Sequence, residues 1–209
     1  VRFLCQKGNE VKRILERLLS AEMVQKHGSL FHVSDPLFRF WLAKVYYRSR
    51  FLSERAPMAN IEAFRSDVSQ AIIESANADR RESPRLIEEL FLKFRNEVVE
   101  LKKRVFKCPH FTEVLSRLNN GRVFPVLAKN GKARWLCQVL SHPVQEEDIH
   151  TFLDDVRCLK GPVQKKMIVG LKGIDLNAKL LAQEEKIQYL DLRDLNFLLD
   201  LYDQLKVVF

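Results

Sequence analysis

The sequence predicts a chain of two domains in the α+β or α/β class. Residues 10–51 alternate between helical and strand-like patterns, and residues 122–205 alternate strands with helices more regularly. A polar segment, NADRRES, lies between these regions at residues 77–83 and is typical of a domain boundary. The 209 residues, 46% of them apolar, suffice for two hydrophobic cores.

The first domain opens with a helix and a hairpin. Apolar residues recur every three or four positions over residues 10–19, which predicts an amphipathic helix. Residues 24–26 and 30–33 have the pattern of two short strands. Gly28 lies in the turn between them, where it is free to take a positive φ angle.

A second helix completes this domain. Ser34-Asp35-Pro36 offers an N-cap and a first-turn proline, and an aromatic-rich helical pattern covers residues 37–51. Helix, two-stranded wing and helix form a winged helix-turn-helix, which we expect over residues 1–52, truncated at its N-terminus. Residues 53–83 are then predicted to form a helical connector.

The second domain is expected over residues 84–209. It begins with two predicted helices, a long one at 84–105 and a short one at 110–118. Two strands joined by a Lys-Asn-Gly-Lys turn follow, and helices then alternate with apolar strands. The expected elements are strands 123–127, 133–140, 166–171 and 187–190 and helices 145–159, 175–185 and 192–205. This order predicts an α/β sheet covered by helices.

Basic residues are concentrated in the first domain. The chain has a formal charge of +8, and residues 1–50 hold ten Lys or Arg against four Asp or Glu. Such a concentration is typical of a surface that binds phosphates. The residues expected to bind nucleic acid are Asn9, Lys12, Arg13, Arg17, Lys26 and His27. Two other interpretations stay open: the cations only solvate an amphipathic helix, or the winged helix joins proteins.

A family resemblance rests on this first domain. The string DPLFRFW at residues 35–41, together with Leu18, Leu19, Val24, Lys26, Phe31 and Val33, resembles the winged-helix segment of archaeal-type ATPases of the STAND/AAA-like class. The resemblance implies that this chain is the C-terminal region of a P-loop ATPase. ATP and Mg²⁺ are then expected in a missing N-terminal domain, which agrees with a chain that opens without Met inside a domain.

The resemblance also implies a restriction-endonuclease-like fold for the second domain. Active members carry PD-(D/E)xK, in which two carboxylates hold Mg²⁺ and the lysine orients a water molecule. The corresponding positions here are Val126, Gln138 and Leu140, and Glu97 is the acid expected on the preceding helix. We therefore predict a degenerate nuclease fold with no catalytic or metal-binding residues and no cofactor. A residual metal-dependent nuclease is an alternative.

The remaining composition excludes several protein classes. The cysteines, Cys5, Cys108, Cys137 and Cys158, form no CxxC pair, so we expect neither a disulfide framework nor a zinc site and favour a cytoplasmic location. No run of 18 apolar residues predicts a membrane helix, and no GxxxxGK[ST] motif occurs.

The expected function is a nucleic-acid-binding or regulatory region that is not itself an enzyme. Its expected partners are nucleic acid, DNA rather than RNA, and its own ATPase domain. The main alternative is a protein–protein interaction module that docks on the ATPase core or on a partner protein. The oligomeric state stays open.

Overall fold

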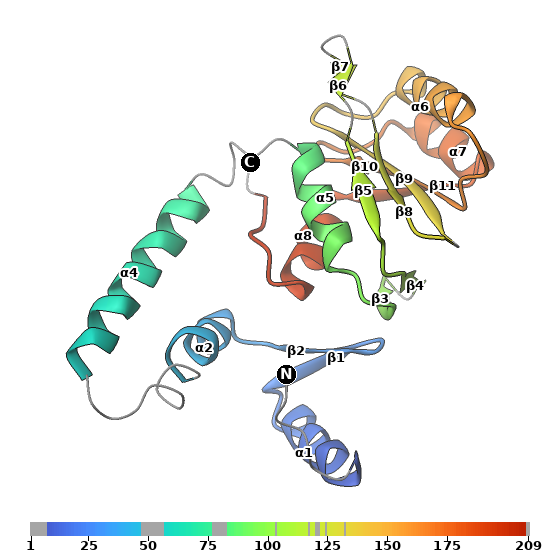
Figure 1. The fold of residues 1–209 in the computed structure, drawn as a ribbon. Coiled ribbons are helices and arrows are strands. Elements are labelled where there is room, and N and C mark those ends of the chain that lie inside the picture. Colours follow the sequence, from blue (N-terminus) through green and yellow to red (C-terminus); the bar gives the residue numbers. More distant parts are fainter. Residues whose placement is uncertain are drawn as a thin grey trace. The chain divides into compact units, whose positions relative to one another are not determined.

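The computed structural model describes residues 8–46, 57–76, 83–102, 104–116, 118–119, 122–123, 125–131 and 133–207. Helices and strands are mixed throughout, which confirms the expected α+β character (Figure 1). The chain divides into two compact units. The first comprises residues 1–76 with 98–106, and the second comprises residues 77–97 with 107–209.

The first unit follows the predicted order of helix, hairpin and helix. Its elements are α1 (Gly8–Ser20), β1 (Val24–His27), β2 (Leu30–Val33), α2 (Pro36–Trp41), the π-helical η1 (Leu42–Tyr46) and α4 (Pro57–Ala76). Asp35 caps α2 as expected, because its Oδ1 accepts hydrogen bonds from the backbone N–H groups of Leu37 and Phe38 at 2.8 and 3.0 Å. Residues 47–56 and Cys5 lie outside the described residues.

The turn of the β1–β2 hairpin is held against another backbone segment. Strand pairing runs from Val24 opposite Val33 to His27 opposite Leu30. The N–H of Ser29 donates to the carbonyl oxygen of Val98 at 2.7 Å, and the N–H of Val98 donates to Oγ of Ser29 at 2.8 Å. Gly28 has a φ of +69°, and a Cβ there would lie 2.1 Å from that carbonyl oxygen. Only glycine fits this turn.

The second unit is built on a five-stranded mixed sheet in the order β11-β10-β9-β8-β5. Strands β9, β10 and β11 are parallel, whereas β8 is antiparallel to both β9 and β5. The strands are β5 (Glu113–Leu115), β8 (Val126–Lys129), β9 (Arg134–Leu140), β10 (Lys165–Gly170) and β11 (Ile187–Asp191). The helices are α5 (Ser83–Lys93), α6 (Glu146–Cys158), α7 (Leu176–Glu184) and α8 (Leu192–Leu201). A short pair, β6 (Leu118–Asn119) and β7 (Arg122–Val123), stands apart from this sheet.

Helices cover both faces of this sheet (Figure 1). On one face, Leu136 and Ile168 join a buried cluster with residues of α6 and α7, such as Phe152 and Ala178. On the other face, Trp135 contacts the rings of Phe91 from α5 and of Phe94, which directly follows α5. Phe94 in turn contacts Tyr202 at the end of α8. Successive residues of a strand point to opposite faces of the sheet. Trp135 therefore belongs to the core on one face and Leu136 to the core on the other.

Two expected helices are wrong. The helix predicted over 84–105 ends at Lys93, and residues 97–101 form β3 (Glu97–Leu101), which pairs with β4 (Arg104–Cys108). Asn96 has a φ of 68°, a left-handed conformation that a continuing helix cannot contain. The helix predicted over 110–118 is also replaced, because residues 113–115 pair with β8. In both segments the spacing of the apolar residues fits a strand as well as a helix.

We expect Gly28→Ala to loosen the β1–β2 hairpin. The added Cβ would meet the Val98 carbonyl in a positive-φ conformation, which should cost roughly 1–3 kcal/mol locally. Hydrogen–deuterium exchange of residues 24–33 should therefore become faster. Gly131→Ala is the matched control, since its Cβ would meet no atom within 4 Å. Equal hairpin protection in both variants would contradict the proposed role of this turn.

Candidate nucleic-acid interface

Helix α1 presents most of the predicted nucleic-acid-binding residues to solvent. Its apolar residues other than the exposed Ile14 are half-buried along one side, while Asn9, Lys12, Arg13 and Arg17 are exposed. With 3.6 residues per turn, Asn9, Lys12 and Arg13 share one face and Arg17 lies at its edge. The structure therefore brings four of the six candidates together on a single exposed helical surface.

Two carboxylates reduce the positive charge of this surface. The Nζ of Lys12 lies 4.0 Å from Oε1 of Glu16, and the two side chains are 78% and 62% exposed. An ion pair this exposed holds its partners weakly, so Lys12 can exchange Glu16 for a phosphate. Glu10 adds a second negative charge in the first turn of α1. Helix α1 thus carries Lys12, Arg13 and Arg17 against two acids.

The hairpin contributes less to this surface than the sequence predicts. Lys26 is exposed, with Nζ 5.8 Å from the centroid of the Phe31 ring. His27 is half-buried, and its ring lies 6.4 Å from that of His32 in an edge-on arrangement. Because Ser29 in the adjoining turn is bonded to Val98, the turn is not a free tip that could enter a groove. Lys26 is thus the better placed of the two candidates.

The degenerate nuclease positions do not share one face of the sheet. Val126 pairs with Cys137 and is 1% exposed, so it points away from the face that holds Gln138 and Leu140. Because Val126 pairs with Cys137 in an antiparallel register, the residue opposite Gln138 is Pro125. Among the described residues, no group of three or more His, Cys, Asp or Glu side chains could hold a metal ion.

Glu97 lies on β3 rather than on the expected helix. Its carboxylate accepts a hydrogen bond from the backbone N–H of Arg95 at 2.6 Å and another from the hydroxyl of Tyr202 at 3.4 Å. These contacts fix the carboxylate beside the start of β3. The described contacts of Glu97 are therefore structural ones.

A half-buried amine on the other face of the sheet was not foreseen from the sequence. Lys165 begins β10, and its Nζ lies 4.3 Å from the centroid of the Trp135 ring. Burial lowers the pKa of Lys165 to about 8, although the aromatic ring favours the charged form. The contact between Lys165 and Trp135 depends on the register of the parallel strands β9 and β10, which places the two residues opposite each other. Local sequence patterns do not reveal this register.

Two thiols beside this amine are held in the neutral form. Burial raises the pKa of Cys108 to about 11 and that of Cys137 to about 12. Burial likewise raises the pKa of Tyr202 far above its ordinary value. Because the thiolate is the reactive form of cysteine, Cys108 and Cys137 are unreactive near neutral pH.

Comparisons with known proteins assign no family. No family model matches the sequence, and no curated protein matches it either. Among solved structures, the crystal structure of protein VC1899 from Vibrio cholerae is similar over 90% of this chain, with 12% identity and a TM-score of 0.34. The chain spans 40% of that protein. Likeness at this level carries no functional conclusion. In the part of the chain that the structure describes, no helix is long and apolar enough to cross a membrane.

The stability of the second unit should rise with pH just above neutrality. The pKa of Lys165 is about 8 in the folded chain against 10.5 ordinarily, so between these values the unfolded chain binds more protons and raising the pH favours folding. We expect the free energy of unfolding to increase by roughly half a kcal/mol between pH 7.5 and 8.5. Ionisation of the unfolded thiols of Cys108 and Cys137, whose ordinary pKa is 9.0, offsets part of the Lys165 effect within this interval and cancels it near pH 9.

Urea unfolding, followed by Trp135 fluorescence in a Trp41→Phe background, measures this effect. Lys165→Met removes the titrating amine, so its free energy of unfolding should stay level or fall over the same pH interval. An equal rise in the Lys165→Met variant would show that another group is responsible.

Proposed function

We propose that this chain binds nucleic acid without catalysing a reaction, through the exposed cationic face of α1. The single observation that carries the proposal is the common exposure of Asn9, Lys12, Arg13 and Arg17 on that helix. The concentration of basic residues in the first 50 positions supports it. Lys26 on the β1–β2 hairpin is also exposed and adds a further cation to the first unit.

Each of these residue types has a distinct task at a DNA duplex. Lysine and arginine neutralise backbone phosphates and release condensed counterions, which supplies affinity without sequence preference. The amide of Asn9 can donate to and accept from a base edge, most favourably adenine in the major groove. A helix with its N-terminal residues in the major groove is the winged-helix docking mode that we propose here.

The proposal extends to the protein that would contain this chain. The DPLFRFW string supports the interpretation that the chain is the C-terminal region of an archaeal-type ATPase, with ATP and Mg²⁺ bound in another domain. Under this interpretation the first unit is a winged helix and the second a restriction-endonuclease-like domain. Gln138 and Leu140, which share one face of β9, then mark a PD-(D/E)xK site that has lost its carboxylate and lysine on this strand, whereas Val126 lies on the other face and is not part of it.

A second candidate function is protein docking, and exposed apolar side chains favour it. Leu37 on α2 is 79% exposed and Trp41 is 43% exposed. On α4, Ile61, Ile72 and Ile73 are each more than half exposed. Large apolar groups left in solvent on neighbouring elements are typical of surfaces that other proteins cover. Docking on the ATPase domain would use these residues rather than the cations of α1.

Binding to duplex DNA should depend steeply on salt. Four phosphate contacts, from Lys12, Arg13, Arg17 and Lys26, predict a slope of log affinity against log salt between about −3 and −4. Fluorescence anisotropy of a labelled duplex, titrated with the whole chain over a salt series, measures this slope. Lys12→Ala and Arg13→Ala should each weaken binding and flatten the slope by about 0.9.

Lys172→Ala and Lys179→Ala are the matched controls, because both remove an exposed cation from the second unit. They should leave the slope unchanged if binding is local to α1. Equal losses in the α1 variants and in the controls would indicate a diffuse charge effect and contradict the proposed site. If DNA fails to bind at low salt while the ATPase domain or another protein is captured through Leu37 and Trp41, docking is the function instead.

A further inference from the structure

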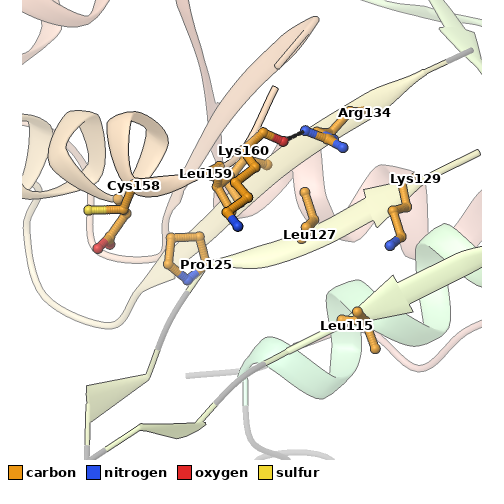
Figure 2. A pocket seen from close by; sticks show the side chains of 10 residues that line it. Leu115, Pro125, Leu127, Lys129, Arg134, Cys158, Leu159 and Lys160 are labelled. Atoms are coloured by element: carbon orange, nitrogen blue, oxygen red, sulfur yellow. Dashed lines mark hydrogen bonds between the residues drawn. The ribbon is translucent and has the colours of Figure 1, made fainter. Parts of the chain in front are cut away.

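The second unit contains a pocket of about 440 Å³ between the sheet and the end of α6 (Figure 2). Its apolar lining comes from Leu115, Pro125, Leu127, Leu136 and Leu159. Leu127 and Lys129 lie on β8, and Pro125 directly precedes this strand. Leu159 and Lys160 directly follow α6 and lie over the strands (Figure 2). A volume in this range with an apolar wall is typical of small-molecule sites.

Charged residues surround this apolar lining. Lys129, Arg134 and Lys160 contribute cations and Asp155 contributes one carboxylate. Lys129 is neutralised by Glu113, since its Nζ lies 2.9 Å from Oε2 of that residue. The other charged residues of the lining are Arg134, Lys160 and Asp155, so their charges sum to one positive charge. The pocket is therefore complementary to a ligand with one negative charge.

Arg134 is held in place before any ligand arrives. Its guanidinium donates to the backbone carbonyl of Lys160, as the dashed line in Figure 2 shows. Gly161 has a φ of +96°, and a Cβ there would lie 2.7 Å from Nη1 of Arg134, so glycine lets the guanidinium approach this turn. The bond to Lys160 uses one of the five N–H donors of arginine, and the other donors can bind an anion. A pre-positioned cation of this kind loses little entropy on binding.

We propose that this pocket binds a monocarboxylate with an apolar tail, of the size of a medium-chain fatty acid. The tail lies against Leu127, Leu136 and Leu159, and the carboxylate lies beside Arg134 and Lys160. This chemistry follows from the apolar wall, the single surplus charge and the fixed guanidinium. It does not depend on nucleic-acid binding by the first unit, because every lining residue belongs to the second unit.

Displacement of a fluorescent probe tests this proposal on the whole chain. The probe is 8-anilinonaphthalene-1-sulfonate, an aromatic molecule with one negative charge, and its emission should rise saturably on binding. Decanoate should displace it, whereas decanol, which has the same tail and no charge, should be several-fold weaker. Equal displacement by decanol would contradict a site that selects an anionic group.

Charge-reversal variants locate the carboxylate. Lys160→Glu should weaken decanoate binding by about fivefold, as expected for the loss of a partly exposed ion pair. Lys179→Glu gives the chain the same net charge from an exposed position on α7 and should change affinity by less than about twofold. Circular dichroism verifies that both variants fold. Equal effects of the two variants would overturn the assignment of the carboxylate to this rim.

Cys158 offers an independent report on where the tail binds. It lines the pocket and is exposed, whereas Cys108 and Cys137 are buried. Decanoate should slow the alkylation of Cys158 by monobromobimane, as quantified by peptide mass spectrometry, and Lys160→Glu should reduce that protection. Probe displacement without any protection of Cys158 would place the ligand elsewhere and refute the proposal.

Discussion

The burial of β10 on both faces is the constraint on which the second unit depends. Met167, Ile168 and Val169 are almost inaccessible to solvent, and β10 pairs in parallel with both β9 and β11. Parallel neighbours need crossover connections, and these are α6 and α7, which both lie on one face of the sheet. Helices α5 and α8 must then cover the other face. The face to which a strand residue points therefore decides whether it lines the pocket or packs against α5 and α8.

That division into faces separates two chemically different regions. The α6 and α7 face carries Leu136 and, at the open end of the sheet, the pocket with Arg134 and Lys160 at its rim. The α5 and α8 face carries Trp135 and Cys137, where burial keeps thiols neutral and favours an uncharged Lys165. The first unit is organised differently, since α1 buries its apolar side only partly and leaves its cations in solvent. The proposed nucleic-acid binding therefore uses exposed side chains of α1, whereas the pocket is formed beside the hydrophobic core of the second unit.

Elements whose apolar residues recur with the spacing of only a helix or only a strand could be predicted from the sequence. Elements whose apolar spacing fits both could not. Helix α1 and the hairpin around Gly28 follow from local spacing and turn chemistry, and so does the exposure of Lys12 and Arg13. Residues 97–101 fit a helical stripe as well as a strand, and the choice depends on the left-handed Asn96. The contact of Lys165 with Trp135, and the pairing of Val126 with Cys137, depend on register between segments far apart in the chain.

Photo-crosslinking is the most direct test of nucleic-acid binding by α1, because it reports where the nucleic acid lies on the chain rather than only whether it binds. A duplex carrying 4-thiothymidine is irradiated with the whole chain at low salt, and crosslinked peptides are identified by mass spectrometry. Binding through α1 predicts crosslinks within residues 8–26, centred on Asn9, Lys12 and Arg13, that disappear as salt is raised. Crosslinks confined to the second unit, or a yield that Lys12→Ala and Arg13→Ala leave unchanged, would contradict it.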